Sequence, residues 1–231
     1  MTDVSPSSMP PSSSSSSSGT FQLTPLYGCE SSTGGALCSV LRLDDCTILL
    51  DLGWDERYDE SQISALQGII AEVDAVLITH PDLAHLGALP YAVGKLGLTA
   101  PVYCTLPVWR NGQMFMYSSW QERAMYDTLP FTLDDIDKAF DQMRQLKYSE
   151  TVKLKERGEG IEITPSCAGH MLGGAFWHIK KDVESIIYAV DFNHAAERHL
   201  NGALLNAPQL QSDKEREQQS WRSSMSCEYD V

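Results

Sequence analysis

The stretch of residues 74–90, DAVLITHPDLAHLGALP, constrains the fold of this chain more than any other feature. It opens with the apolar run 75–78, which is typical of a short buried strand. A loop with His80, Asp82 and His85 follows, and a helix-like segment comes after it. In layered α/β folds, ligands bind at the loops beyond the carboxyl ends of such strands. This loop is therefore the first candidate functional site, because two imidazoles and a carboxylate crowd together in it.

The loop resembles the second sequence motif of the metallo-β-lactamase family, His-x-His-x-Asp-His-x-Gly, in the family's RNA-processing branch. The resemblance implies two zinc ions, one bound by the first two histidines and the other by the Asp and the last histidine. In this chain residues 80–87 read HPDLAHLG, so the outer histidines are present, but Asp82 replaces the second histidine and Ala84 replaces the Asp. Zinc accepts a carboxylate, whereas alanine offers no ligand. The resemblance therefore implies a motif that keeps its outer histidines and its glycine but has lost two of its usual metal ligands.

Three further segments match the other motifs of the family in order. Asp51, two residues before Gly53, matches the Asp-x-Gly of motif one, where the resemblance implies that the Asp braces the metal loop without binding metal. His170 matches the Gly-His of motif three, and Asp191 matches motif four, whose carboxylate bridges both zinc ions. Four motifs in order over about 140 residues make coincidence a poor explanation. The residues expected to converge as remnants of the metal pocket are His80, Asp82, His85, His170 and Asp191.

Strand-like and helix-like segments alternate along the chain, which is typical of an α/β protein. Thr132 and Asp135 form a capping-box-like start to a helix that the apolar spacing extends to Tyr148. Helices are also predicted over residues 61–71 and 106–125. Strands are predicted over 21–27, 36–43, 47–51, 75–78, 101–104, 150–154, 161–164, 175–180 and 185–190.

The family resemblance covers residues 21–206 and implies the αβ/βα sandwich of the metallo-β-lactamase fold. Only the N-terminal part of that sandwich is expected, because the sequence contains neither the β-CASP insertion of the family nor the strands that return after it. Residues 1–20 are rich in Ser and Pro and bury too little apolar surface to offset their ordering entropy, so a disordered tail is expected. Residues 207–231 are polar and lack periodic apolar positions, so an unstructured tail is expected there too.

Charge and cysteine content argue against several classes of function. The formal net charge of −14 opposes the phosphate backbone, so the chain alone is a poor candidate for tight nucleic-acid binding. No apolar run approaches the ~20 residues of a membrane span, and no membrane association is expected. The six cysteines form no C-x-x-C pair, which excludes a zinc ribbon. An intracellular chain with reduced cysteines is expected.

Residues 192–206, FNHAAERHLNGALLN, extend the resemblance to an inactive branch of the family that works in the machinery for pre-mRNA 3′ ends. The resemblance implies a non-catalytic scaffold subunit, or pseudo-nuclease, of the cleavage and polyadenylation complex in the nucleus. Its expected partners are the other subunits, including the catalytic paralogue, and pre-mRNA reached through the complex. No catalytic residue, no metal ligand and no cofactor are expected.

Two other hypotheses remain open. The first is a metal-dependent phosphodiester hydrolase with a reduced one-zinc site, in which His80, Asp82 and His170 leave a position for water. The second is a non-functional truncated product that folds poorly. The missing carboxylate at Ala84 favours the scaffold over the hydrolase, because the resemblance implies that phosphodiester cleavage uses two metals held by the full ligand set.

Overall fold

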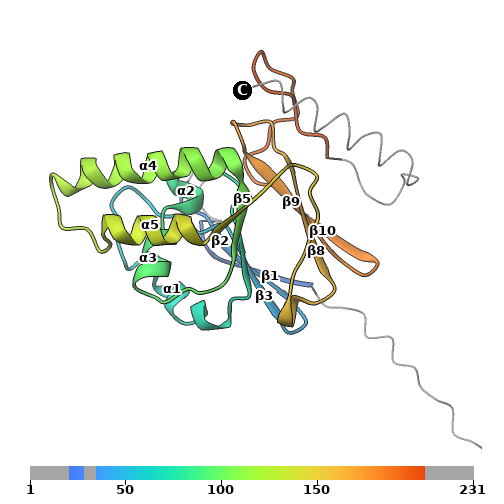
Figure 1. The fold of residues 1–231 in the computed structure, drawn as a ribbon, viewed down its shortest axis with the longest axis horizontal. Coiled ribbons are helices and arrows are strands. Elements are labelled where there is room, and N and C mark those ends of the chain that lie inside the picture. The colour runs from blue at the N-terminus through green and yellow to red at the C-terminus, as the bar shows by residue number, and fades with distance from the viewer. Residues whose placement is uncertain (1–20, 29–34, 206–231) are drawn as a thin grey trace, which may run out of the picture.

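The computed structural model describes residues 21–28 and 35–205, whose strands form two packed sheets (Figure 1). Sheet A has six strands in the order β1-β2-β3-β4-β5-β6. The first three pair antiparallel, and from β3 onward each strand runs parallel to its neighbour. The strands of sheet A are β1 (Phe21–Tyr27), β2 (Cys38–Leu43), β3 (Cys46–Leu50), β4 (Ala75–Leu77), β5 (Val102–Thr105) and β6 (Met143–Leu146).

Sheet B is antiparallel throughout and has four strands in the order β10-β9-β8-β7. Its strands are β7 (Val152–Lys153), β8 (Ile161–Cys167), β9 (Ala175–Lys181) and β10 (Glu184–Tyr188). The buried indole of Trp177 on β9 donates a hydrogen bond to the carbonyl of Ile78 at 3.2 Å. Because Ile78 directly follows β4, the two sheets are tied together beside the loop that begins at Thr79.

The helices pack on the face of sheet A that points away from sheet B, which gives the molecule three layers (Figure 1). The longest of them, α4, begins at Thr105, whose hydroxyl accepts a hydrogen bond from the backbone N–H of Val108 as an N-cap. The helices are α1 (Ser64–Gln67), α2 (Leu83–Leu86), α3 (Leu89–Gly94), α4 (Leu106–Ala124) and α5 (Leu133–Gln142), with the 3₁₀ turns η1 (Ile70–Glu72) and η2 (Glu156–Gly158).

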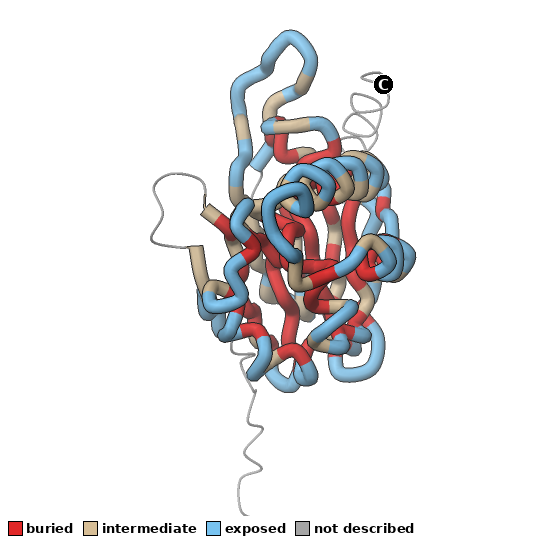
Figure 2. Tube along the Cα trace, turned by 90° about the vertical axis from the view of Figure 1, so that its left-hand side faces the viewer, coloured by how far each residue is buried: buried red, intermediate tan, exposed pale blue. Residues whose placement is uncertain are grey.

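The two central strands of sheet A are apolar at almost every position because both faces of this sheet are covered. On β4, Val76 packs among the helices, whereas Ala75 and Leu77 pack against sheet B. On β3 the same alternation places Leu49 among the helices and Leu50 against sheet B. Figure 2 shows the resulting buried chain running through the middle of the molecule. These two strands therefore form the rigid base from which the site loops extend.

The helix predicted over residues 132–148 is correct at its start and wrong at its end. Thr132 and Asp135 form the reciprocal hydrogen bonds of a capping box, as predicted. The helix ends at Gln142, because the next four residues pair with β5 as the parallel strand β6. Sheet pairing outweighs the helical spacing of the apolar residues there, an effect that a local sequence pattern does not reveal.

The helix predicted over residues 61–71 is also shorter than expected. The structure has only the single turn α1 followed by the 3₁₀ turn η1, and Gly68 lies between them. Glycine is a poor helix former, and α1 ends there. The remaining predicted strands lie where β1 to β5 and β7 to β10 are found, although β7 has only two residues.

The predicted α/β class is confirmed. Of the predicted αβ/βα sandwich, the described residues supply one helical layer and both sheets, and within those ranges no helix packs on the outer face of sheet B. In the part of the chain that the structure describes, no helix is long and apolar enough to cross a membrane. The tails predicted over 1–20 and 207–231 lie outside the described residues.

Candidate functional site

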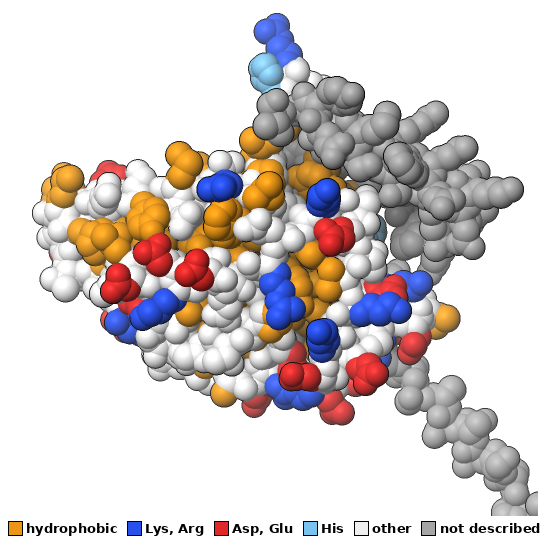
Figure 3. All heavy atoms as spheres, viewed as in Figure 1, with side chains coloured by type: hydrophobic (Ala, Val, Ile, Leu, Met, Phe, Trp, Pro, Cys, Tyr) orange, Lys and Arg blue, Asp and Glu red, His pale blue; other side chains and the backbone are white. Residues whose placement is uncertain are grey.

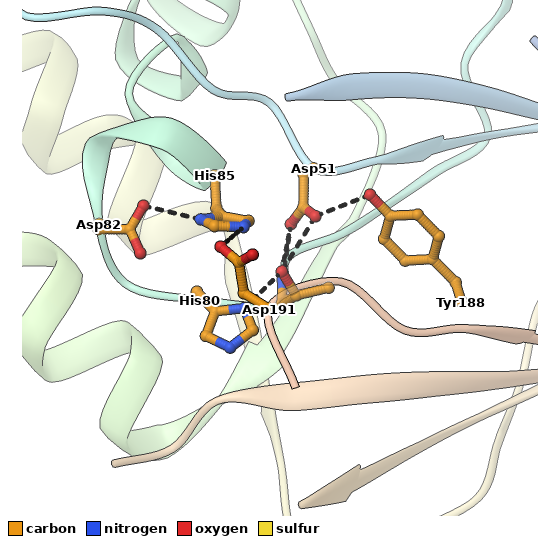
Figure 4. A network of polar contacts seen from close by, with 7 residues as sticks. Asp51, His80, Asp82, His85, Tyr188 and Asp191 are labelled. Atoms are coloured by element: carbon orange, nitrogen blue, oxygen red, sulfur yellow. Dashed lines mark hydrogen bonds and ion pairs between the residues drawn. The ribbon is translucent and has the colours of Figure 1, made fainter. Parts of the chain in front are cut away.

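The candidate site lies at one edge of the two sheets, where several strands end (Figure 4). Parallel pairing of β3 and β4 brings Asp51 and Thr79 to the same edge of sheet A, because both residues lie just beyond the carboxyl ends of their strands. The loop after β4 and helix α2 carry the residues of motif two. Sheet B contributes the connection between β8 and β9 and the segment after β10. The two sheets thus bring all four predicted motifs together.

Asp51 is the buried anchor of the site. Its fully buried carboxylate accepts hydrogen bonds from the backbone N–H of Thr79 at 2.8 Å and from the Thr79 hydroxyl at 2.9 Å. The Tyr188 hydroxyl, at the end of β10, donates to the other carboxylate oxygen at 3.0 Å. Burial raises the pKa of Asp51 to about 6, although the charge of His85 and these hydrogen bonds oppose the rise. Asp51 therefore ties the loop after β4 to sheet B, as expected of a bracing residue.

Two carboxylates of the site have a left-handed backbone. Asp51 has a φ of 58° and Asp191 has a φ of 45°. Aspartate tolerates this region better than most residues, but the conformation still has a cost that the surrounding contacts must offset. Such conformations concentrate at functional sites. The sequence motifs mark both positions, but they do not reveal this backbone geometry.

Gly53 explains why motif one contains a glycine. A Cβ at this position would lie 1.7 Å from the carbonyl oxygen of Ala84, so only glycine fits. The backbones on either side are joined, because Leu52 N–H donates to the His85 carbonyl at 2.7 Å and Trp54 N–H donates to the Leu83 carbonyl at 2.8 Å. The segment after β3 therefore holds the motif-two loop through its backbone.

His80 has a tautomer that its neighbours define. The single hydroxyl proton of Thr79 goes to the Asp51 carboxylate, so Thr79 Oγ1 accepts from His80 Nδ1–H at 2.9 Å. Nε2 of His80 is then an open lone pair, and it has no hydrogen-bond partner among the described residues. Burial, helped by the charge of His85, lowers the pKa of His80 to about 4. His80 is therefore a neutral ring at pH 7.

His85 has the opposite protonation state. Its Nδ1–H donates to Asp82 at 2.7 Å, and its Nε2 lies 3.4 Å from Asp191 in an ion-pair contact that is not a well-directed hydrogen bond (Figure 4). Burial alone would lower the pKa of His85, but the Asp82 hydrogen bond and the charges of Asp51, Asp82 and Asp191 raise it to about 9. The hydrogen bond and charge of His85 outweigh desolvation and lower the pKa of Asp82. His85 is therefore an imidazolium among carboxylates.

The five predicted remnants of the metal pocket lie close together. The ring centroids of His80 and His85 are 4.8 Å apart, and those of His80 and His170 are 5.7 Å apart. Gly174, just before β9, allows this closeness because a Cβ there would lie 2.8 Å from the His80 ring. Asp191 reaches the same group through its contact with His85. Residues from positions 80 to 191 thus converge at one place.

The donors do not fit the two-zinc centre that the family resemblance implies. Ala84 has no donor atom, and the Asp82 carboxylate is engaged by His85. Among the described residues of the site, Nε2 of His80 and Nε2 of His85 are buried without a hydrogen-bond partner, and the latter lies 3.4 Å from Asp191. Among the residues that the structure describes, no group of three or more His, Cys, Asp or Glu side chains is arranged to hold a metal ion.

Thr79 and Tyr188 belong to the site but are not among the residues predicted from the sequence. The Thr79 hydroxyl donates a hydrogen bond to Asp51 and accepts one from His80, and the Tyr188 hydroxyl connects Asp51 to β10. A signal for Thr79 exists, since a polar residue directly between an apolar strand and a candidate ligand is placed to orient that ligand. No comparable signal exists for Tyr188, because only the packing of the two sheets brings it to Asp51.

Comparison with known proteins identifies the same region. Residues 40–221 match the family of metallo-β-lactamase superfamily domains. The probable cleavage and polyadenylation specificity factor subunit 2 of Drosophila melanogaster is 53% identical over 177 residues, which cover 76% of this chain and 23% of the relative. The Arabidopsis thaliana cleavage and polyadenylation specificity factor subunit 2 is 47% identical over 187 residues, which cover 80% of this chain and 25% of the relative.

A more distant relative is cleavage factor two protein 2 of Schizosaccharomyces pombe, which is 34% identical over 180 residues, 78% of this chain and 22% of the relative. The chain spans about a quarter of the length of the curated relatives it matches. The family match covers well over half of the chain. The chain therefore belongs to the metallo-β-lactamase superfamily, and its sequence is similar to that of cleavage and polyadenylation specificity factor subunit 2.

Proposed function

We propose that this chain is part of a non-catalytic scaffold subunit, a pseudo-nuclease, of the nuclear complex that cleaves and polyadenylates pre-mRNA. One observation carries the proposal: the Asp82 carboxylate binds His85 Nδ1 at 2.7 Å while Ala84 provides no donor. The family motif places metal ligands at both positions, so their replacement supports a non-catalytic role. The similarity to relatives named as cleavage and polyadenylation specificity factor subunit 2 supports a role in the cleavage and polyadenylation of pre-mRNA.

The surface of the molecule supports a role in protein contacts. Helix α4 exposes Leu106, Met114 and Phe115, of which Met114 is 69% exposed. Figure 3 shows hydrophobic side chains gathered along α4, with acidic side chains beside them on α5. Exposed apolar groups of this kind are typical of interaction surfaces. The proposed partners are other subunits of the complex, including the catalytic paralogue.

Pre-mRNA is reached through the complex in this proposal. The formal net charge of −14 makes the chain itself a weak competitor for a polyanion. The basic surface that guides the RNA would therefore be supplied by other subunits.

A one-zinc hydrolase is the second candidate, and the open Nε2 of buried His80 favours it. Its proposed ligands are His80, Asp82 and His170. Oδ1 of Asp82 already accepts a 2.7 Å hydrogen bond from His85 Nδ1, which leaves its other oxygen as the donor for a metal. The missing donor at Ala84 favours the scaffold, and the zinc content of the folded chain separates the two candidates.

RNA cleavage by the purified chain tests the proposal. A labelled RNA with a polyadenylation cleavage site is incubated with the chain and zinc, and with the catalytic subunit of the complex as a positive control. We expect no product above that of RNA alone, and we expect the chain to co-purify with the reconstituted subunits. Cleavage that a chelator abolishes would refute the non-catalytic role. Failure to join the subunits would refute the scaffold role.

Restoring the family pattern tests why the site is inert. The double variant Asp82→His and Ala84→Asp supplies both missing ligands, so zinc bound per folded chain should rise above that of the parent. Efficient RNA cleavage is not expected, because the relatives are about four times longer than the matched region. The control is Asp134→His on the exposed side of α5, which should leave zinc content unchanged. No rise in a well-folded sample would mean that the loop backbone, restricted by Pro81, has diverged.

A further inference from the structure

We propose that the outer face of α4 docks a basic amphipathic helix of another protein. The docking face is the exposed stripe Met114, Ser118, Gln121 and Met125. The apolar side of the partner helix lies on this stripe, and its Lys and Arg side chains lie against acidic segments on both sides. The proposal rests on the scaffold role proposed above and adds to it the kind of segment that the scaffold receives.

Helices α4 and α5 lie in the same layer but have different outer surfaces. Every exposed position of α5 is charged, and these positions are Asp134, Asp137, Lys138 and Asp141. Among the exposed positions of α4 only Arg110 and Glu122 are charged, whereas Leu106, Met114 and Phe115 are large and apolar. A helix with apolar side chains on both its inner and its outer side is typically covered on both. The outer face of α4 is therefore expected to be covered by a partner, and that of α5 by water.

The docking face has the pattern of a helix-binding surface. Met114, Ser118, Gln121 and Met125 are spaced by four, three and four residues, which places them on one side of the helix. Met114 is 69% exposed and Met125 is 79% exposed, and the two residues between them are uncharged. The flexible thioether of methionine adapts to apolar partners of different shapes. A partner helix with apolar residues at the same spacing can therefore lie along the stripe.

Acidic segments border the docking face on both sides. On one side, the hydroxyl groups of Ser119 and Tyr58 form a 2.7 Å hydrogen bond that holds the loop 55–60 against α4. On the other side, the Tyr117 hydroxyl donates to Asp137 on α5, and Figure 3 shows acidic side chains of α5 beside the hydrophobic ones along α4. The acidic residues of the two segments are Asp55, Glu56, Asp59, Glu60, Asp134, Asp137 and Asp141, against the cations Arg57 and Lys138.

The carboxylates beside the docking face are available to a basic partner. Within the described residues, no Lys or Arg side chain forms an ion pair with any of these seven carboxylates. The nearest cation on α4 itself, Arg110, lies over the Trp109 ring at 4.7 Å. The surplus of negative charge on both sides of an apolar stripe therefore complements a helix that has Lys and Arg on both sides of its apolar residues.

The same charges disfavour other occupants of the face. Carboxylates repel the phosphates of RNA and of an anionic membrane surface. A second copy of the chain would dock through a two-fold axis, which brings the same patch of both copies together. The acidic segments of the two copies would then face each other, and like charges across an interface cost free energy.

Peptide binding to the unmodified 231-residue chain tests the proposal. The probe is a fluorescent synthetic helix as long as α4, with Leu along one side and Lys at the other positions. One control peptide has Glu in place of every Lys, and another has the Leu and Lys residues in scrambled order. We expect the Leu/Lys helix to bind at least about tenfold more tightly than either control in fluorescence anisotropy, and more weakly as salt is added. Equal binding of either control peptide would overturn the proposal.

Two substitutions on the docking face test its apolar part. Met114→Gln combined with Met125→Gln should weaken binding of the Leu/Lys helix by about tenfold, because the partner loses its apolar contacts. Both side chains are exposed, so the thermal midpoint should stay within about 1 °C of the parent. The matched control is Val183→Gln in the turn between β9 and β10, where Val183 is 90% exposed, and it should leave binding unchanged. Unchanged binding by the double variant would refute the docking face.

Two substitutions on α5 test the charge of the partner. Asp134→Asn combined with Asp141→Asn should weaken binding by about threefold at low salt and by less at high salt. The matched control is Asp182→Asn, in the same turn as Val183, and it should have no effect. Equal binding by the α5 double variant and the parent at low salt would refute a basic partner.

Sedimentation equilibrium of the chain alone tests the rival occupant. We expect no dimer that Met114→Gln dissociates, and such a dimer would overturn the proposal in favour of a second copy. None of these measurements involves RNA or the other subunits. A chain that joins the subunits but does not bind the Leu/Lys helix would overturn the docking face and leave the proposed function standing.

Discussion

Two histidines five residues apart differ in charge within the same site. His80 is a neutral ring whose pKa is lowered to about 4, and His85 is an imidazolium whose pKa is raised to about 9. Both rings are fully or almost fully buried. The difference lies in their partners, because Nδ1 of His80 meets a hydroxyl on Thr79 while Nδ1 of His85 meets the carboxylate of Asp82.

The comparison teaches that burial alone does not decide the charge of a histidine. Desolvation lowers the pKa of both rings, but only at His85 do direct contacts with carboxylates outweigh it. Thr79 places one hydroxyl group between His80 and the Asp51 carboxylate, and burial together with the charge of His85 keeps the His80 ring neutral. In the His80 half of the site Nε2 has no partner among the described residues, whereas in the His85 half the ring pairs with Asp82.

The largest effect is expected from disturbing Gly53, whose close contact with the loop after β4 supports both halves of the site. In Gly53→Ala the new Cβ would lie 1.7 Å from the carbonyl oxygen of Ala84, so the loop backbone must move away. We expect a loss of more than about 4 kcal/mol in the free energy of unfolding, or no folded protein at all. Urea denaturation followed by fluorescence measures this loss. The control is Gly68→Ala, where the nearest atom is 3.9 Å away and no loss is expected. A folded Gly53→Ala variant of normal stability would contradict the close backbone contact.

A smaller effect follows from removing the anchor of the His80 half. Asp51→Ala leaves the N–H of Thr79, its hydroxyl and the Tyr188 hydroxyl without their acceptor. We expect a loss of about 3 kcal/mol in the free energy of unfolding, because buried donors remain unpaired. The same denaturation experiment measures it, with the exposed Asp134→Ala as the control. Equal stability of the two variants would mean that Asp51 does not brace the loop.

The contribution of His85 to stability should be lost at alkaline pH. The pKa of His85 is raised from 6.5 to about 9, so its contribution to stability is fully present below pH 6.5 and is lost as the pH rises through about 9. The groups that face the ring are Asp51, Asp82, Asp191 and His80. We expect the free energy of unfolding to fall by on the order of 2 kcal/mol over this range. Denaturation curves collected at a series of pH values measure this fall.

The matched control for the alkaline experiment is His178, a histidine that is only partly buried. His85→Asn should flatten the fall between pH 6.5 and 9, whereas His178→Asn should leave it in place. Desolvation lowers the pKa of His178, so its contribution is lost as the pH decreases and not as it increases. The same alkaline fall in all three proteins would show that other groups cause it.

The smallest effect concerns the link between the halves. Tyr188→Phe removes the hydroxyl that donates to Asp51 at 3.0 Å and keeps the aromatic ring in the core beside sheet B. We expect a loss of about 1 kcal/mol, since the carboxylate keeps its Thr79 bonds. The control is Tyr126→Phe, a surface change on a side chain that is 77% exposed. Double-mutant analysis with Asp51→Ala should give a loss smaller than the sum of the two single losses.

Most of the fold was predictable from the sequence because its signals are local. The apolar run of β4, the hairpin of β2 and β3 and the capping box at Thr132 each depend on neighbouring residues, and the structure contains all three. The failure at β6 has a physical cause. Its four residues continue a helical spacing, and only pairing with β5, about 40 residues earlier, makes them a strand.

The site was predictable as a set of residues but not as a set of charges. Motif positions indicate that His80, His85 and Asp191 converge, because parallel strands end at a common edge. Which ring takes a proton depends on contacts of less than 3 Å between side chains of the loop after β4 and of helix α2, which the motif does not reveal. Tyr188 was missed because only the packing of the two sheets brings its hydroxyl to Asp51, 137 positions away in the sequence.

The loop after β4 is held by its main chain and by one missing methyl group at Gly53, not by the side chains that would do chemistry. The backbone contacts with the segment around Gly53 therefore fix the shape of the loop, whereas the side chains of residues 80–87 determine its chemistry. For a protein engineer, Ala84 is a partly exposed side chain on a loop whose backbone is held in place, so a metal-binding side chain could be introduced there by a single substitution.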